Sequence, residues 1–286
     1  MCLKTFVCNP FKGERSGVNR GESCQFTHNS SLSTVHSHAF TLAETLIVMG
    51  IIGVVAALTI PNVNKNTGRA EAVAKVKKIY AELNEAHNRA TAVYGPIEKW
   101  FTQDKCNEYP NEQCTQRYYD RITEFMKLQK DCRNNSNCTK SVRYYLHNGN
   151  SGGFNRFPAA ILAGGFSIRI NGYFYPACNN SNVYNYSTCG LIEIDLDGPS
   201  KGKQSWGTDI FTFVITKEGI KPFGGGTNWT DSNIKSYCSY SGEYCAEWVI
   251  RNGNMDYLDT YHTNDSNKGK CKSNGKLLST TVSSCK

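Results

Sequence analysis

The segment Phe40–Ile60 limits what this chain can fold into more than any other part of the sequence. Its 21 residues contain one charged side chain, Glu44, and are otherwise almost entirely apolar. A helix of that length is about 30 Å long, enough to cross the hydrocarbon core of a bilayer. No other stretch of the chain is comparably apolar. We therefore expect one membrane-spanning helix between the polar residues 1–39 and the remaining residues 61–286.

Glu44 is unusual inside such a helix, because an ionised side chain in hydrocarbon costs about 2–3 kcal/mol or more unless it is paired or near the interface. Two interpretations follow from the residues alone: Glu44 binds a cationic partner, or it lies at the headgroup boundary and extends into water. Gly53 and Ala57, four residues apart, would let helices approach closely, or they are simply small residues in an apolar helix. Cleavage after Ala57 by a signal peptidase is disfavoured, since the preceding polar region is far longer than in a secretory signal.

The residues Ala39-Phe40-Thr41-Leu42-Ala43-Glu44 resemble the prepilin peptidase site of type IV pilins and type II secretion pseudopilins. Members of that family share the order Phe-Thr-Leu-x-Glu, then an apolar run and a proline, which here is Pro61. Ala39 departs from the family pattern, since glycine usually precedes the cut. The resemblance implies removal of residues 1–39 as a leader, methylation of the new amine on Phe40, and a role for Glu44 in assembly.

The new amine would lie one helical turn from Glu44, on nearly the same face of the helix. In the family, the amine of a neighbouring subunit would neutralise this glutamate and so fix the axial register of the helices, as a buried polar group does in a coiled coil. The resemblance therefore implies a structural subunit of a type IV pilus or a type II secretion filament, and not an enzyme. The implied partners are other pilin or pseudopilin subunits, prepilin peptidase, the inner-membrane assembly platform and membrane lipid.

Two alternatives remain open at this point. The chain is a minor tip pilin, an adhesin whose head binds DNA or sugar, or, more remotely, a secreted hydrolase. The implied location is the bacterial inner membrane, with one span and the C-terminal head outside the cytoplasm, and then a filament in the periplasm or at the cell surface. The distribution of basic residues opposes this orientation, because Arg20 alone lies within twenty residues before the apolar segment whereas several follow it. Those that follow are Lys65, Arg69, Lys75, Lys77 and Lys78.

Cysteine supports a head outside the cytoplasm. Of the thirteen cysteines, ten follow Phe40, and an even number of this kind is typical of disulfides formed in an oxidising compartment. The simplest of many connectivities joins the neighbours in sequence: Cys106 with Cys114, Cys132 with Cys138, Cys178 with Cys189, Cys238 with Cys245, and Cys271 with Cys285. A zinc site is the alternative, but the sequence has no Cys-x-x-Cys, and the three histidines after Phe40, namely His87, His147 and His262, lack ligand spacing.

The remaining pattern predicts an α+β, pilin-like fold. Apolar residues from Ala72 to Tyr94 recur at helical spacing, Gly95-Pro96 ends that helix, and His87 on its apolar stripe is expected to be packed rather than to bind a ligand. A second helix is predicted over 116–130. Strands are predicted at 160–163, 166–170, 192–196 and 210–215, with turns at Gly164-Gly165 and Glu218-Gly219.

A helix followed by a strand meander is the order of an α+β domain. The resemblance implies a long N-terminal helix, made of the membrane span and an amphipathic half, packed on an antiparallel sheet in a disulfide-rich head. The expected organisation is therefore a leader over 1–39, a transmembrane and assembly helix over 40–61, an amphipathic helical half over 62–95, and a globular head over 96–286.

Candidate chemistry in the head is limited. Asp195, Asp197 and Asp209 lie in a segment similar to one in pseudopilin-like proteins, some of which bind calcium, and their hard oxygen atoms suit that ion. The alternative is that these aspartates accept hydrogen bonds from turn amides. The many tyrosines and the net charge of +8 are compatible with stacking on sugars or single-stranded DNA, or with ordinary packing. No phosphate-binding or hydrolase motif is present, and no catalytic residue is predicted.

Overall fold

A computed structural model describes most of the chain beyond residue 40. The described residues are 41–101, 112–133, 144–151, 159–170, 174–175, 177–179, 187–198, 201, 204–225 and 230–286, without the side chains of 59–65 and 112. The chain divides into two compact units, Met1–Val54 and Val55–Lys286. The predicted cleavage residues Ala39 and Phe40 lie outside the described residues, as do Cys106 and Cys138.

The longest element is the helix α1, Leu42–Tyr94, of 53 residues. Its backbone continues through Pro61 without interruption. The helix ends where the sequence predicts, because Gly95 has a φ of +79°, which favours glycine, and Pro96 follows it. The indole nitrogen of Trp100 donates to the carbonyl oxygen of Gly95 and ties the chain back onto the helix end.

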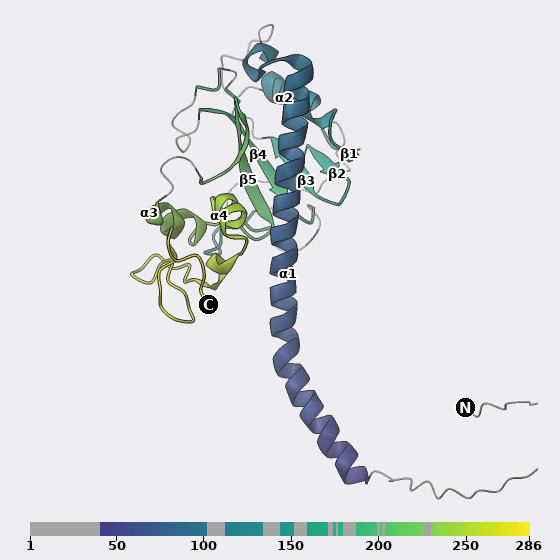
Figure 1. Cartoon of the computed structure of the whole chain (residues 1–286), viewed down its shortest axis with the longest axis vertical. Helices are drawn as coiled ribbons and strands as arrows, with labels where there is room; N and C mark the ends of the chain where they lie inside the picture. Colours follow the sequence, from purple (N-terminus) through teal and green to yellow (C-terminus); the bar gives the residue numbers. More distant parts are fainter. Residues whose placement is uncertain are drawn as a thin grey trace, which may run out of the picture. The chain divides into compact units, whose positions relative to one another are not determined.

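The predicted apolar stripe of α1 is confirmed from Val73 to Ala90. Its buried members are Val73, Val76, Ile79, Leu83, Ala86, His87 and Ala90. The prediction is wrong at the end of the stripe, since Val93 is 63% and Tyr94 37% exposed. The Tyr94 ring contacts Trp100 and Arg121 at the edge of the core and is not enclosed by it. The second half of α1 lies across one face of the sheet (Figure 1). There the Tyr80 ring stacks on Phe213 with ring centres 5.7 Å apart.

The sheet is an antiparallel meander of six strands in the order β1-β2-β3-β4-β5-β6. The strands are β1 Leu128–Asp131, β2 Ala160–Leu162, β3 Ser167–Ile170, β4 Thr188–Asp195, β5 Ile210–Thr216 and β6 Gly219–Pro222. The central pair β4 and β5 places Ile192 opposite Phe213 and Ile194 opposite Phe211. The two predicted turns are confirmed as the β2–β3 and β5–β6 connections, and Gly219 has the positive φ of +131° that such a turn requires.

Two short helices follow α1 and cover the same core. They are the 3-10 helix η1, Ile97–Phe101, and the α-helix α2, Glu112–Thr123. The predicted helix over 116–130 is therefore wrong beyond Thr123, because the chain turns there and pairs Leu128 and Lys130 with strand β2. The apolar spacing that suggested a longer helix continues into an edge strand, which a single sequence does not distinguish.

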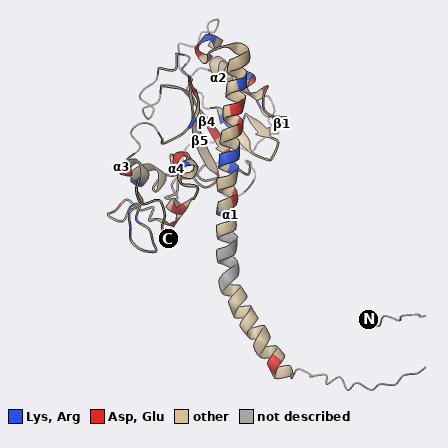
Figure 2. Ribbon diagram, viewed as in Figure 1, with Lys and Arg blue, Asp and Glu red and all other residues tan. Residues whose placement is uncertain are grey.

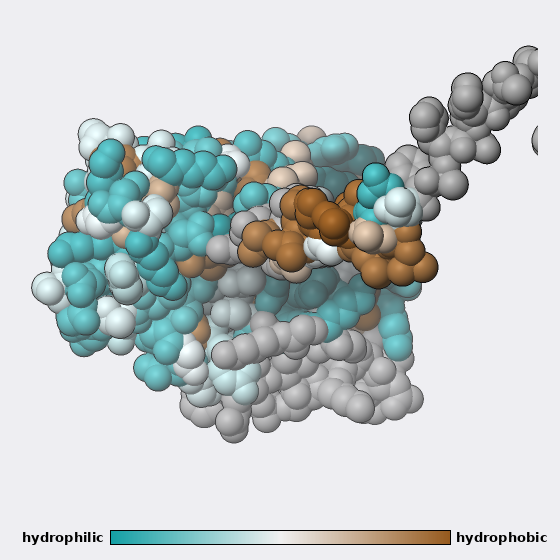
Figure 3. Space-filling view, turned by 90° about the horizontal axis from the view of Figure 1, so that it is seen from below, coloured by the Kyte–Doolittle hydropathy of each residue, from teal (hydrophilic) through white to brown (hydrophobic). Residues whose placement is uncertain are grey.

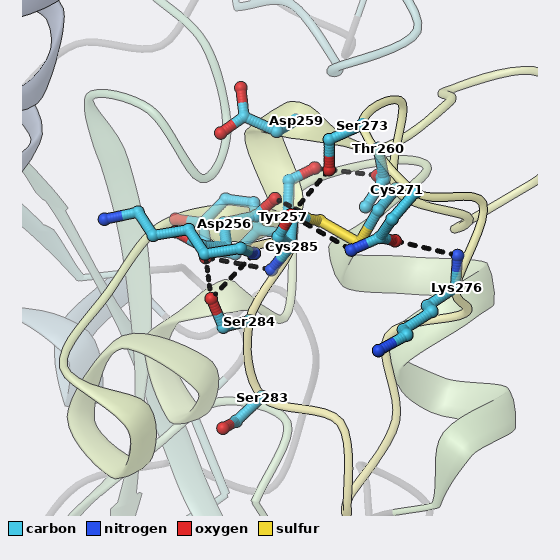
Figure 4. The surroundings of a disulfide bond; sticks show 12 residues. Asp256, Tyr257, Asp259, Thr260, Cys271, Ser273, Lys276, Ser283, Ser284 and Cys285 are labelled. Atoms are coloured by element: carbon cyan, nitrogen blue, oxygen red, sulfur yellow. Dashed lines mark hydrogen bonds between the residues drawn. A yellow bond between two sulfur atoms is a disulfide. The ribbon is translucent and has the colours of Figure 1, made fainter.

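Residues 230–286 form a C-terminal lobe of short helices and irregular chain. Its helices are α3 Asp231–Asn233, η2 Ile234–Cys238, α4 Cys245–Asn252 and η3 Asp256–Asp259. Two of the predicted disulfides, Cys238–Cys245 and Cys271–Cys285, hold this lobe together. Around the second bridge, the Asp256 carboxylate accepts hydrogen bonds from Ser284 and from the backbone of Cys285 (Figure 4).

The fold class α+β, with an antiparallel sheet and disulfides, is confirmed. The predicted bridge Cys178–Cys189 is also present, and Cys114 and Cys132 are each disulfide-bonded. One hydrophobic core joins the second half of α1, α2, the sheet and the C-terminal lobe. The buried side of α1 from Val73 to Ala90 thus shares its core with the sheet, on which the amphipathic half was expected to pack.

Candidate functional site

The most unusual surface of the molecule is the apolar segment, defined as residues Leu42–Leu58 of α1. Ten of its large hydrophobic side chains are more than half exposed: Leu42, Leu46, Ile47, Val48, Met49, Ile51, Ile52, Val54, Val55 and Leu58. Figure 3 shows a group of apolar side chains, in brown, beside the grey trace at which the described chain begins. Exposure of this extent marks a surface that requires an apolar partner or solvent.

The apolar segment has no polar face. Glu44 is its one charged residue, and Figure 2 shows this part of α1 uncharged except at one acidic position in the first turn. A helix that is apolar on all sides is normally buried in a large core or in a membrane. Within the described residues, however, no helix carries an apolar stretch long enough to cross a bilayer.

Glu44 forms a capping box with Thr41 at the start of α1. The Thr41 backbone N–H and hydroxyl both donate to the Glu44 carboxylate at 2.9 Å, and the Glu44 N–H donates to the Thr41 hydroxyl at 3.2 Å. This exchange satisfies amides that would otherwise lack partners at the helix start. The pattern Thr-x-x-Glu of residues 41–44 is the sequence signal for this cap.

The small residues predicted to assist assembly lie on the exposed surface of α1. A side chain carbon added at Gly53 would meet no described atom within 4 Å, and Ala57 is exposed. Pro61 lies within the helix, but the surroundings of its side chain are not described. The surface at Gly53 and Ala57 is therefore open to a neighbouring helix.

The three predicted calcium ligands come from the loops at one end of β4 and β5. The Asp195 carboxylate accepts hydrogen bonds from the backbone N–H groups of Asp197 and Gly198 at 3.2 and 3.1 Å, the turn arrangement that was the alternative to calcium. Burial, together with the Asp197 carboxylate, raises the pKa of Asp195 well above its ordinary value. Burial and the same neighbour raise the pKa of Asp209 to about 6.

These aspartates have the oxygen chemistry of a calcium site without its geometry. One buried oxygen of Asp197 has no hydrogen-bond donor among the described residues, as expected of a crowded acidic loop. Yet no three His, Cys, Asp or Glu side chains of the described chain are grouped closely enough to hold a metal ion. The calcium and zinc hypotheses therefore receive no support from the arrangement of these residues.

The histidines of the head are packed rather than arranged as ligands. His87 is buried, and its Nδ1 lies 3.1 Å from the Tyr118 hydroxyl. Burial lowers the pKa of His87 to about 4. His147 and His262 stack with ring centres 5.1 Å apart, a pair that sequence reasoning missed because 115 positions separate them and no pattern links them.

Comparison with known proteins adds no relative. No protein-family model matches the chain, and no match was found among curated proteins or among solved structures. The functional argument therefore rests on the residues and the geometry described above.

Proposed function

We propose that this protein is a pilin-like or pseudopilin-like structural subunit of a bacterial filament. In this proposal the chain is cut between Ala39 and Phe40, is held in the inner membrane by the helix that begins there, and assembles through it with other subunits. The protein acts through assembly and not as an enzyme. The prepilin peptidase and the membrane platform that builds the filament would be its processing and assembly partners.

The observation that carries the proposal is the exposed apolar segment with a single acid in its first turn. Ten large apolar side chains in water would favour aggregation, so they need lipid or neighbouring helices around them. A helix apolar on every side fits a bundle of identical helices, since each face then has an apolar neighbour. Support also comes from the head, in which the second half of α1 covers an antiparallel meander.

Glu44 has a defined role in this proposal. In the described structure its carboxylate bonds only to Thr41 of its own chain. A new amine on Phe40 would lie next to this capping box in sequence, and the amine of a neighbouring subunit would supply the charge that the carboxylate needs in an apolar bundle. Capping orders the acid before assembly, and pairing with a neighbour would then fix the axial register.

The proposal is tested first by mass spectrometry of the native N terminus. We expect a chain that begins at a methylated Phe40. An intact Met1 in assembled material, or a chain that begins at Leu58, contradicts the proposal.

The second test compares Glu44→Ala with Glu85→Ala, an exposed acid farther along the same helix. Loss of a pairing worth about 2 kcal/mol should lower filament recovery by roughly tenfold or more for Glu44→Ala. Glu85→Ala should leave recovery unchanged, because Glu85 only pairs with Arg89 on the helix surface. Equal recovery for both variants would refute the assembly role of Glu44.

A further inference from the structure

The outer side of the second half of α1 carries six charged side chains in one row. Residues four and three positions apart lie on the same side of a helix. We call this row the charged stripe, and its members are Glu71, Lys75, Lys78, Glu82, Glu85 and Arg89. Their side chains are 33% to 70% exposed, and Figure 2 shows acidic and basic positions along this part of α1. The stripe is therefore available to a partner outside its own chain.

The stripe forms three ion pairs within the helix, but the order of their charges is not the best for helix stability. The pairs join residues four positions apart: Glu71 with Lys75 at 2.7 Å, Lys78 with Glu82 at 3.8 Å, and Glu85 with Arg89 at 3.7 Å. An isolated helix is stabilised more when the acid precedes the base. The middle pair has the base first, so the stability of the helix alone does not explain this order.

The sign of the charge reverses every seven residues along the stripe. It does so in two rows: Glu71, Lys78 and Glu85, and then Lys75, Glu82 and Arg89. If two identical helices run parallel and are shifted by seven residues, about 10 Å, opposite charges meet at four positions. Without a shift, or with a shift of fourteen residues, like charges face each other instead. The reversed middle pair creates this preference, since acid-first order throughout would make a shift of seven residues repulsive.

Small exposed residues beside the stripe fit the same shift. Ala74, Ala81 and Asn88 recur every seven residues and are exposed. A shift of seven residues sets Ala74 opposite Ala81, and Ala81 opposite Asn88, which lets the two helix backbones approach closely. A shift of four residues would also join three opposite pairs, but it would set Ala74 against Lys78. The small residues therefore favour the shift of seven.

Aromatic rings of the head hold two bases of the stripe. The Lys78 ammonium lies 5.9 Å from the centre of the Phe166 ring, and the Arg89 guanidinium lies 5.1 Å from the centre of the Phe125 ring. Long side chains held in this way lose less conformational freedom when they bind a partner. The stripe also borders a groove of about 490 Å³, which Phe125 and Leu162 line as well. This groove leaves room for side chains of a second helix.

We propose that the charged stripe binds the charged stripe of a second copy of this chain, parallel to it and shifted by seven residues. This inference rests on the proposed function, which gives all copies the same direction because they share one membrane. In the opposite direction the two stripes would also match, with Glu71 beside Arg89. The stripe adds a second control of axial register to the one proposed for Glu44.

The stripe acts through specificity more than through affinity. Each exposed ion pair contributes little by itself, so loss of one carboxylate, as in Glu85→Ala, is tolerated. Like charges in contact repel each other and exclude the wrong shifts. Reversal of charge is therefore the informative change.

The first test exchanges two charges of the stripe, in the variant K78E/E82K. The exchange preserves the composition, the net charge and all three pairs within the helix, but it makes all four contacts between shifted copies repulsive. Filaments sheared from cells that produce the full chain should be recovered at least tenfold less than for wild type. Recovery equal to that of wild type would overturn the proposal.

The matched control reverses all six charges of the stripe, in E71K/K75E/K78E/E82K/E85K/R89E. It alters more residues than the exchange, yet it restores four opposite pairs at a shift of seven residues. Recovery should therefore be within about twofold of wild type. Recovery as low as for K78E/E82K would overturn the proposal. Thermal unfolding in detergent checks that the head of each variant remains folded.

The shift itself is measured by disulfide cross-linking between two differently tagged copies in assembled material. A disulfide needs Cα atoms within about 7 Å of each other. Ala74→Cys in one copy should therefore cross-link to Ala81→Cys in the other, whereas Ala74→Cys should not cross-link to itself. Self cross-linking of Ala74→Cys, or cross-linking of Glu71→Cys to Arg89→Cys, would overturn the proposal. Filaments that lack the cross-link between positions 74 and 81 contradict the shift alone, whereas a wild-type chain that forms no filament contradicts the proposed function.

Discussion

Apolar side chains are exposed in the first half of α1 and buried in the second half. Leu46, in the first half, is 64% exposed, whereas Leu83, in the second half, is 1% exposed. The second half alternates its buried stripe with an outer face of lysine, arginine and glutamate, including pairs such as Lys75 with Glu71. The first half has no polar face to leave in water. The comparison teaches that the pattern of apolar residues, more than their number, decides whether a helix packs on its own domain.

The test with the largest expected effect replaces one leucine in each half of α1. Leu83→Ala should lower the free energy of unfolding of the head by about 2–5 kcal/mol, because it leaves a cavity in the common core. Leu46→Ala should change that free energy by less than about 0.5 kcal/mol, because nothing described covers Leu46. Denaturant titration of both variants in the same detergent measures the difference. Similar losses would show that the two halves are not distinct.

A test with a smaller expected effect measures how the free energy of unfolding depends on pH through His87 in the buried stripe. His87 has a pKa of about 4 in the folded protein, against an ordinary value of 6.5. The folded state therefore resists protonation, and its stability is complete above pH 6.5 and falls as the pH is lowered towards 4. Between pH 7 and pH 5 the wild-type chain should lose about 2 kcal/mol through this histidine.

His87→Gln removes the titrating ring while keeping a side chain that can reach the Tyr118 hydroxyl. The difference in stability between wild type and variant should shrink by about 2 kcal/mol from pH 7 to pH 5. Buried aspartates with a raised pKa, such as Asp195, titrate equally in both proteins and cancel in the comparison. A difference that stays constant with pH would show that His87 is not buried in its neutral form.

Much of the head follows from local sequence patterns. The stripe from Val73 to Ala90, the glycine turns and three of the disulfides each depend on residues that are close in sequence. Helical period, turn conformation and the pairing of neighbouring cysteines act locally. The edge strand β1 was missed because its pairing with β2 is decided by residues about thirty positions away. Burial of His147 against His262 likewise depends on the tertiary fold.

The other features of the molecule also differ in whether the sequence alone reveals them. The apolar segment and its single acid can be found in the sequence, because an uninterrupted apolar run without a polar face is a local pattern. The surroundings of Gly269 cannot, since Lys235 and Leu277 come together only when the loops of the C-terminal lobe close around the glycine. The contact of Arg69 with Asp259 likewise depends on the tertiary fold, since 190 positions separate the two residues.

A third test concerns the point where the second half of α1 begins to contact the C-terminal lobe. Arg69 donates two hydrogen bonds to the Asp259 carboxylate, at 2.5 and 3.0 Å, and both side chains are partly buried. Arg69→Met should lower the free energy of unfolding by about 1–2 kcal/mol, since it removes two hydrogen bonds to a partly buried carboxylate. Arg89→Met serves as the control, because Arg89 is more exposed and its ion pair lies on the surface. If Arg69→Met and Arg89→Met both change the free energy of unfolding only negligibly, the Arg69–Asp259 contact does not stabilise the fold. The packed half of α1 then begins after Arg69.

The smallest expected effect concerns the first turn of α1. In the exposed half, this turn is stabilised by the capping box of Thr41 and Glu44. Thr41→Ala removes the hydroxyl that bonds to the Glu44 carboxylate and N–H, and should destabilise the first turn by about 1 kcal/mol. Amide exchange in that turn should accordingly quicken about fivefold, while exchange around Leu83 stays unchanged. Thr41→Ser restores a hydroxyl cap and should return the wild-type rate. If Thr41→Ala also quickens exchange in the buried stripe, the two halves of the helix unfold as one cooperative unit despite their different surroundings.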